Sequence, residues 1–366
     1  IDLNGYDLVY TQTLNNNGTL NIVDTSTDHN GSIRNSNNAS TIYNTGTITI
    51  SGGQIIGSRD TIKNSDNANV IINGGRVEQN GSTEYFTTAI YNGKVTINDG
   101  VVANINPANT LSVMFYLTKV TMNGGKLISS GNSISPIGIL GNVSTLTMNG
   151  GTIEADGIIV QTGGALTMNG GVINVNANKS NLNVNESNTS STSITMNGGT
   201  INAYNEGSIS CLSGNIVVVN DGTVNCESKN GTAYAISGGT KYIYGGTITA
   251  NSINGNAYGA NGGTLYIGKN DDTIHKDTPV IQGKTYGITG SSVYFYDGTL
   301  KGATHAYNNI NIIAVPDGAL THTETIDDVE NCWLIEDEPY LEANGIQYNS
   351  LTKAYDATAS GDTITV

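Results

Sequence analysis

The sequence predicts an all-β chain folded as a right-handed parallel β-helix, a solenoid of about twelve coils, with a C-terminal hairpin and a short helix. Two observations support this fold class. One phrase, apolar-Thr-apolar-Asn-Gly-Gly-x-apolar, returns along most of the chain and is complete at residues 146–153. The chain also contains 47 glycines but only 5 prolines among its 366 residues, as expected for many short strands separated by tight turns.

The phrase repeats at the spacing of one solenoid coil. Its second glycine returns after 20 residues, as from Gly151 to Gly171, to 28 residues, as from Gly171 to Gly199. Coils of such uneven length favour a right-handed β-helix over a strict six-residue left-handed one. The aligned positions are Gly53, Gly75, Gly100, Gly125, Gly151, Gly171, Gly199, Gly222, Gly246, Asn270, Gly298 and Gly318.

Each coil is expected to contribute three strands. In the phrase, alternation turns the apolar residues to one face and Thr to the other. Asn and Gly tolerate a positive φ angle, so we expect both to form the turn. A second strand follows the glycines, and a third short segment precedes the phrase, as at residues 41–44 and 235–238. Stacked coils would therefore form three parallel sheets.

The pattern divides the chain into three parts. Residues 1–40 are predicted entry coils, residues 41–320 the β-helix repeats, and residues 321–366 an acidic exit segment with a hairpin and a helix. Asn344-Gly345 between alternating runs is a strong hairpin signal. Ser350 is a candidate N-cap for the helix that follows.

Composition limits the function. The formal net charge of −15 argues against nucleic acid and anionic membranes as partners, since both need a basic face. No apolar run is long enough to cross a bilayer, so no membrane insertion is expected in this chain. Of the three cysteines, Cys211, Cys226 and Cys332, buried thiols are the simplest expectation. A Cys211–Cys226 bridge requires that neighbouring coils place the two side by side.

The repeated Thr-apolar-Asn-Gly-Gly-Thr-Ile phrases, the opening Ile-Asp-Leu-Asn-Gly and the closing Ser-Leu helix with Gly-Asp-Thr-Ile-x-Val resemble the pectate-lyase-like right-handed β-helix superfamily. The resemblance is to its adhesin-like surface-protein members in Gram-positive and gut bacteria. It implies an extracellular protein, secreted or attached to the bacterial cell surface, that serves as a stiff spacer and binding surface.

The closing segment stands at an unusual place. In proteins of that kind it precedes the β-helix and covers its first coil, whereas here it comes last. Because the chain also begins at Ile1 without Met, we expect a piece of a longer protein in which Val366 leads into a second module. Alternatively, residues 346–366 of one chain cover the open first coil of the next, head to tail.

Catalysis finds little support in the sequence. Glycoside hydrolases need paired carboxylates, and polysaccharide lyases typically need calcium-binding acids beside a basic residue. Arg34, Arg59 and Arg76 lie in the first quarter without acid-rich coils beside them. We therefore expect no catalytic residues and no cofactor. The alternative is a polysaccharide lyase or glycoside hydrolase on the same fold.

No metal site is predicted either. The histidines, His29, His275, His305 and His322, lack the spacing of metal ligands and are expected at the solvated surface. Asp271, Asp272 and Asp277 carry oxygen ligands suited to calcium, but they lack the order of known calcium loops. They are expected to be solvated loop acids.

A binding surface has one specific signal, in the outward column of the Thr strand. This column reads Thr147, Thr167, Thr195 and Val218 and then changes to Tyr242, Tyr266 and Tyr294. Stacked tyrosines would offer apolar faces with polar edges to a host or environmental glycan or protein. Alternatively, the rings pack against one another or under the loop at residues 271–279. The candidate ligand-binding residues are Tyr242, Tyr266 and Tyr294, flanked by Tyr244 and Tyr296.

The threonine column also raises ice binding through regularly spaced hydroxyls. The neighbouring column, however, is interrupted by Gln54, Arg76, Lys126 and Val172. Thr is explained well enough as a soluble residue that favours strands.

Overall fold

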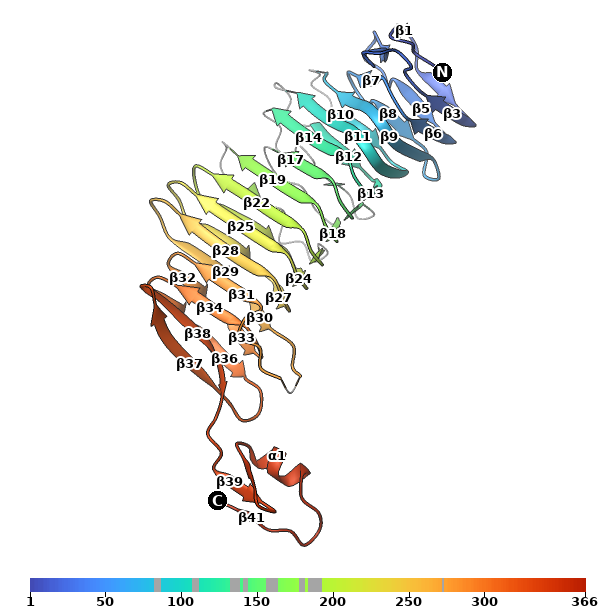
Figure 1. Ribbon diagram of the computed structural model, residues 1–366. Coiled ribbons are helices and arrows are strands. Elements are labelled where there is room, and N and C mark those ends of the chain that lie inside the picture. Colours follow the sequence, from blue (N-terminus) through green and yellow to red (C-terminus); the bar gives the residue numbers. More distant parts are fainter. Residues whose placement is uncertain are drawn as a thin grey trace.

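The chain forms a long parallel β-solenoid of about 11 turns with a small unit of sheet and helix at its C-terminal end (Figure 1). This computed structural model describes residues 1–81, 87–106, 112–131, 139–140, 144–155, 164–177, 182–183, 193–271 and 273–366. The predicted all-β class and solenoid are confirmed. The predicted count of about twelve coils agrees with the about 11 turns of the structure, and the turn at Gly318 leads into a hairpin instead of another coil.

Three strands per coil are confirmed, and they build three faces. The first face holds the strands of the repeated phrase: β3 (Thr19–Ile22), β6 (Thr47–Ile50), the first parts of β9 (Asn69–Gln79) and β11 (Lys94–Asn106), β13 (Lys119–Met122), β16 (Thr145–Met148), β18 (Ala165–Met168), β21 (Ser193–Met196), β24 (Ile216–Val219), β27 (Thr240–Ile243), β30 (Thr264–Ile267), β33 (Ser292–Phe295) and β36 (Asn311–Ala314).

The second face holds the strands after the glycines, and it includes the last parts of β9 and β11. Its other strands are β1 (Asp7–Tyr10), β4 (Ser32–Asn35), β7 (Gln54–Gly57), β14 (Lys126–Gly131), β17 (Thr152–Ala155), β19 (Val172–Ala177), β22 (Thr200–Asn205), β25 (Thr223–Ser228), β28 (Thr247–Ser252), β31 (Val280–Gly283) and β34 (Thr299–Gly302).

The third face holds the short segments that precede each phrase, in two runs of hydrogen-bonded strands. The first run is β2 (Leu14–Asn16), β5 (Ile42–Asn44), β8 (Ile62–Asn64), β10 (Thr87–Tyr91), β12 (Ser112–Tyr116) and β15 (Ile139–Leu140). The second run is β20 (Leu182–Asn183), β23 (Ile209–Ser213), β26 (Ala233–Ser237), β29 (Ala257–Asn261), β32 (Tyr286–Thr289) and β35 (His305–Asn308).

The core is a stack of inward side chains from all three faces. Along the first face, Ile97, Met122, Met148 and Met168 succeed one another at full burial. Burying an aliphatic side chain of this size contributes about 1.5–3 kcal/mol. The rod is therefore held together by one continuous core that grows with each coil.

The turn after the phrase works differently from the prediction. Its second glycine has a positive φ angle, 83° at Gly151, and a Cβ there would lie 2.7 Å from the carbonyl oxygen of Gly125. The asparagines with positive φ in the described part of the chain lie elsewhere, at Asn4, Asn92, Asn309 and Asn344. The phrase asparagines instead form a ladder in which each side-chain amide donates to the preceding one at 2.7–2.8 Å: Asn73, Asn98, Asn123, Asn149, Asn169, Asn197 and Asn220.

A hairpin that the sequence did not predict closes the C-terminal end of the solenoid. β37 (Ala319–Ile326) and β38 (Val329–Glu336) pair with each other, and β38 pairs antiparallel with β34. This hairpin places Cys332, Trp333 and Leu334 over the last coils, where they are buried. The segment predicted as an acidic exit is therefore, in its first part, the end cap of the solenoid.

The small C-terminal unit agrees with the prediction. β39 (Leu341–Ala343) and β40 (Ile346–Tyr348) form the hairpin around Asn344-Gly345, both with positive φ, and β41 (Ile364–Thr365) pairs with β39. The helix α1 (Leu351–Asp356) begins after Ser350, whose side chain accepts a hydrogen bond from the backbone N–H of Lys353. Asp317 at the end of the rod accepts a hydrogen bond from the Ser350 hydroxyl and so ties the two parts together.

Two of the three cysteines form a disulfide, which corrects the expectation of buried thiols. Cys211 on β23 and Cys226 on β25 are bonded inside the core, with their Cα atoms 6.0 Å apart. Neighbouring coils thus place the two side by side, the condition that the bridge required. Cys332 is a free, buried cysteine, and burial raises the pKa of its thiol to about 11.

Candidate ligand-binding face

Three tyrosines form a stacked ladder on the first face. Tyr242 on β27, Tyr266 on β30 and Tyr294 on β33 are register partners on consecutive coils. Their ring centroids lie 4.8 and 4.4 Å apart, with interplanar angles of 13° and 9°. All three side chains are half-buried. The structure places these residues together where the sequence predicted, and we call them the tyrosine ladder.

The stacking changes what the ladder offers to a ligand. Each ring covers the face of its neighbour, so ring edges and hydroxyl groups, instead of flat faces, point outward. Only the two outer faces are left, that of Tyr242 next to Val218 and that of Tyr294 next to Ala314. The rings thus pack against one another, as the predicted alternative states.

The environment of the ladder favours the protonated form of its middle hydroxyl group, that of Tyr266. Loss of solvent, together with the neighbouring phenols of Tyr294 and Tyr242, raises the pKa of Tyr266. A protonated phenol can donate and accept a hydrogen bond. The row therefore suits a polar, uncharged partner group.

Tyr244 and Tyr296 flank the ladder but do not continue it. Their ring centroids lie 6.1 Å from Tyr242 and 6.4 Å from Tyr294, respectively. In the coil between them, the position of Tyr244 and Tyr296 is held by Gly268. The backbone N–H of Gly268 donates to the carbonyl of Ile243 in the preceding coil, just as the N–H of Tyr296 donates to the carbonyl of Ile267. The inserted loop at residues 269–279 leaves the rod at this gap.

A second aromatic row, which sequence reasoning missed, runs along the third face. Tyr234, Tyr258, Tyr286 and His305 stack on consecutive coils, with ring centroids 5.3, 5.8 and 6.3 Å apart. The signal was present, because these residues recur at one position of the segment that precedes each phrase. Aligning that segment as well as the phrase would have found them.

A groove of about 520 Å³ lies at the corner between the third face and the first face. It is bounded by chain segments that connect the strands of the second row to those of the tyrosine ladder. Hydroxyl, amide and backbone groups dominate its lining, which suits hydrogen bonding to a polar ligand. The lining residues are Gly263, Thr264, Gly290, Ser291, Ser292, Asn309, Ile310 and Asn311.

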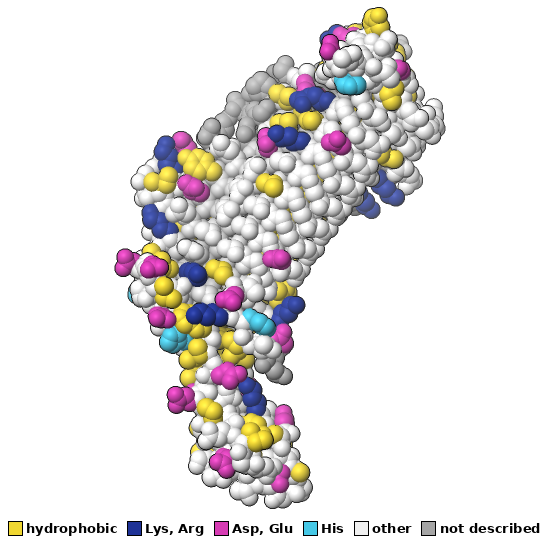
Figure 2. Space-filling model, in the orientation of Figure 1, with side chains coloured by type: hydrophobic (Ala, Val, Ile, Leu, Met, Phe, Trp, Pro, Cys, Tyr) yellow, Lys and Arg dark blue, Asp and Glu magenta, His cyan; other side chains and the backbone are white. Residues whose placement is uncertain are grey.

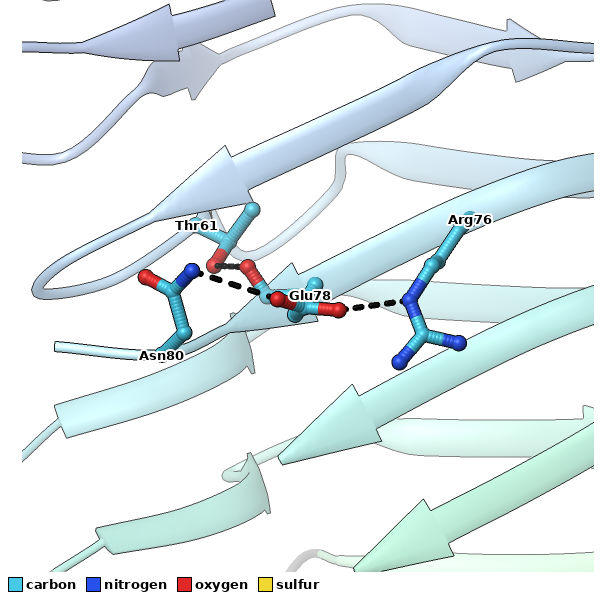
Figure 3. A network of polar contacts seen from close by, with 4 residues as sticks. All are labelled: Thr61, Arg76, Glu78 and Asn80. Atoms are coloured by element: carbon cyan, nitrogen blue, oxygen red, sulfur yellow. Dashed lines mark hydrogen bonds and ion pairs between the residues drawn. The ribbon is translucent and has the colours of Figure 1, made fainter. Parts of the chain in front are cut away.

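Two of the three arginines, Arg34 and Arg76, each form an ion pair with one acid. Arg76 donates from Nε to Glu78 at 2.6 Å, and Asn80 donates to the other carboxylate oxygen at 3.2 Å (Figure 3). Thr61 donates to the backbone carbonyl of the same glutamate at 2.8 Å. Arg34 likewise pairs with Asp7. A guanidinium anchored in this way serves as a hydrogen-bond donor and is poorly placed to remove a proton from a substrate.

The loop acids and histidines that were expected at the solvated surface lie in different environments. Asp277 is exposed, and Asp272 lies outside the described residues. Asp271 and His275 converge on Asp297, which belongs to the next coil. His322 is half-buried with its ring centroid 4.8 Å from that of Trp333, so the expectation of a solvated side chain is wrong for it.

Charge is distributed unevenly over the rod. In the view of Figure 2, charged side chains gather toward the two ends and one edge, and a broad stretch between them carries uncharged groups. No helix in the described part of the chain is long and apolar enough to cross a membrane.

Comparison with models of known protein families, with curated proteins and with solved structures finds no match.

Proposed function

We propose that the chain is a non-catalytic, adhesin-like protein of the bacterial cell surface, secreted or wall-attached, which acts as a rigid spacer and ligand-binding rod. The observation that carries this proposal is the tyrosine ladder, an ordered row of half-buried aromatic residues in a column that elsewhere consists mostly of threonine. Its ligand is a glycan or a protein with uncharged polar groups. With a net charge of −15, the chain repels polyanionic ligands.

The spacer role is supported by continuous stacking. Parallel strand pairs link successive coils along the first and second faces from the first strands to the last. The asparagine ladder adds a row of side-chain hydrogen bonds along the same axis. Such a body transmits position along its length with little bending, because each coil is fixed by both neighbours.

The extracellular location is supported by the disulfide. Cys211 and Cys226 form a buried bridge, and disulfides persist mainly in oxidising environments outside the cytosol. The same bridge ties a third-face strand to a second-face strand just before the coils that carry the ladder.

The function is tested by applying the folded chain to an array of glycans and extracellular matrix proteins, with a parallel assay for new reducing or unsaturated sugar ends. We expect saturable binding to a glycan or protein and no release of chain ends. Release of ends would establish the alternative, a polysaccharide lyase or glycoside hydrolase on this fold. Absence of binding across the array would contradict the adhesin proposal.

Head-to-tail assembly through residues 346–366 is a second proposal, and it concerns the partner. Among the described strands, β1 and β2 of the first coil pair on one side only, and Tyr6 and Val9 are 71% and 53% exposed. At the other end, Leu351 and Tyr355 on α1 are 61% and 71% exposed. Apolar surface at both ends favours contact between them.

Deleting residues 346–366 tests this contact. We expect the full chain to form concentration-dependent oligomers in light scattering and the shortened chain to stay monomeric. If both have the same mass at all concentrations, the head-to-tail contact does not exist.

A further inference from the structure

Asp271, His275 and Asp297 bring three potential metal ligands to one point at the C-terminal end of the rod. One ligand atom from each residue lies within 4.8 Å of the other two. Asp271 and His275 lie in the inserted loop, and Asp297 lies in the turn after β33. The three residues do not form a sequence motif for metal binding, because they come together only when one coil is stacked on the next.

The loop is fixed in this position by several hydrogen bonds. The backbone N–H of His275 donates to the Asp297 carboxylate, and the carbonyl of His275 accepts from the N–H of Gly298 at 2.7 Å. The hydroxyl of Thr299 donates to the carbonyl of Lys276 at 2.7 Å. The imidazole is thereby held against Asp297, with Nδ1 3.0 Å from Oδ2.

A glycine permits the close approach. A Cβ at Gly268 would lie 2.0 Å from the Cβ of Asp297, and the φ angle of Gly268 is +74°. Every residue type with a side chain would therefore push Asp297 away from the start of the loop. Gly268 replaces the asparagine or tyrosine found at this position in other coils, such as Asn220, Tyr244 and Tyr296.

The negative charge at this point lies on two carboxylates with one histidine between them. The side chain of Asp297 is only 8% exposed, and its ion-pair partner is His275. Within the described ranges, no lysine or arginine forms an ion pair with Asp271 or Asp297. The nearby Lys276 is occupied elsewhere, because its ammonium lies 3.7 Å from the centroid of the Trp333 ring. Two carboxylates, one of them buried, therefore face a single histidine, and buried charge requires a partner.

We propose that Asp271, His275 and Asp297 bind a divalent transition-metal ion of the zinc class, which fixes the inserted loop to the rod beside the tyrosine ladder. One imidazole with two carboxylates suits zinc, whereas calcium takes six to eight oxygen ligands. Three protein ligands leave one position of a tetrahedral ion for water. The proposal does not depend on what the tyrosine ladder binds.

The chain supplies a matched control for the test. His305 and Glu330 form a second histidine–carboxylate pair, with Nδ1 3.1 Å from Oε2. Among the described residues, no third His, Cys, Asp or Glu places a ligand atom within 4.8 Å of this pair. The group of Asp271, His275 and Asp297 is the one set of three that meets this distance. Substitution of His305 removes a histidine of similar exposure without touching the proposed site.

The test is calorimetric titration of zinc chloride into the full metal-free chain and into the variants Asp271→Asn, His275→Gln and His305→Gln. We expect one zinc ion per chain, binding weakened at least about tenfold in Asp271→Asn and His275→Gln, and unchanged binding in His305→Gln. Cobalt gives a second readout, because a protein-bound ion shows visible absorption that His275→Gln should lose. Hydrogen exchange at residues 269–279 should slow when zinc is added.

Equal zinc affinity in the chain and in His275→Gln would overturn the site, as would the absence of saturable binding to the unsubstituted chain. Calcium binding without zinc binding would also overturn it, because the imidazole would then have no role. Circular dichroism of each variant separates the loss of a ligand from the loss of the fold.

Discussion

Lys241 stands where the other coils place an apolar side chain toward the core. Its register partners are Val217 and Leu265, and its side chain is fully buried. The ammonium donates to the carbonyls of Gly238 and Gly262. Burial lowers the pKa of Lys241 to about 8, because removal from water disfavours the charged form. One residue thus gives the core a titratable group next to Tyr242.

This burial predicts a pH dependence of stability with a defined sign. Between about pH 8 and the ordinary lysine value near 10.5, the unfolded chain holds this proton and the folded chain does not. The free energy of unfolding should therefore rise with pH across this window. Compared with Lys241→Met, the unsubstituted chain should gain roughly 2 kcal/mol between pH 7.5 and 9.5 in urea unfolding. Parallel pH profiles for the two proteins would show that Lys241 does not titrate in this range.

Asp24 shows the opposite case at the first coils. Burial tends to raise the pKa of its carboxyl group, but hydrogen bonds from Ser26, Gly31 and Gly5 outweigh it and lower the pKa to about 2. The contribution of this carboxylate to stability is present above its ordinary value of 3.8 and lost as the pH falls toward 2. The hydrogen bonds that the Asp24 carboxylate accepts from Ser26, Gly31 and Gly5 are therefore present over the whole physiological pH range.

At the scale of the element, the unit is a coil whose strands are short and whose turns are specialised. The second position of the turn requires glycine for two reasons, as at Gly125 and Gly151. Its φ angle is positive, and a Cβ there would lie too close to the backbone carbonyl oxygen of the preceding coil. The asparagine is required by its neighbours, because Asn149 donates to Asn123 and accepts from Asn169. The phrase therefore repeats because its residues contact the neighbouring coils, and not only because they form a local turn.

The disulfide belongs to this scale, because it joins strands of two coils. The bridge spans a sequence separation of 15 residues, and closing a loop of that length stabilises the fold by about 3 kcal/mol. We expect the double variant Cys211→Ala, Cys226→Ala to unfold at a lower temperature than the unsubstituted chain. Titration of thiols in denaturant should find one free thiol in the chain, that of Cys332. Three free thiols and an unchanged melting temperature would contradict the bridge.

Over the whole molecule, the sequence predicted the repeated phrase and its tyrosine column, but it did not predict the closing hairpin or the grouping at Asp271. The period placed Tyr242, Tyr266 and Tyr294 in one column, because a parallel register carries each coil onto the next. The closing hairpin escaped prediction, since the strand β37 is exposed along nearly all its length and lacks the usual alternation. The grouping of Asp271 with Asp297 escaped as well, because it depends on how an inserted loop folds back.

At the same scale, the candidate binding residues gather at one end of the rod. In the first part of the rod the outward column is mostly threonine, with Ile71 among the exceptions, and the aromatic residues of this column begin only after Val218. The tyrosine ladder, the second aromatic row and the corner groove all lie on the last coils. The aromatic residues of the outward column are thus concentrated near one end of the rod.

The central claim is that the tyrosine ladder binds the ligand. The most direct measurement is the dissociation constant of the ligand found on the array, for the unsubstituted chain, for Tyr242→Thr/Tyr266→Thr/Tyr294→Thr and for the upstream control Thr147→Ala/Thr167→Ala/Thr195→Ala. The triple Tyr→Phe variant keeps the stacked rings and isolates the hydroxyl row. We predict binding at least about tenfold weaker, or more than 1.4 kcal/mol, in the Tyr→Thr variant, with the control unchanged and both folded. Equal affinity of the Tyr→Thr variant and the unsubstituted chain would contradict the account.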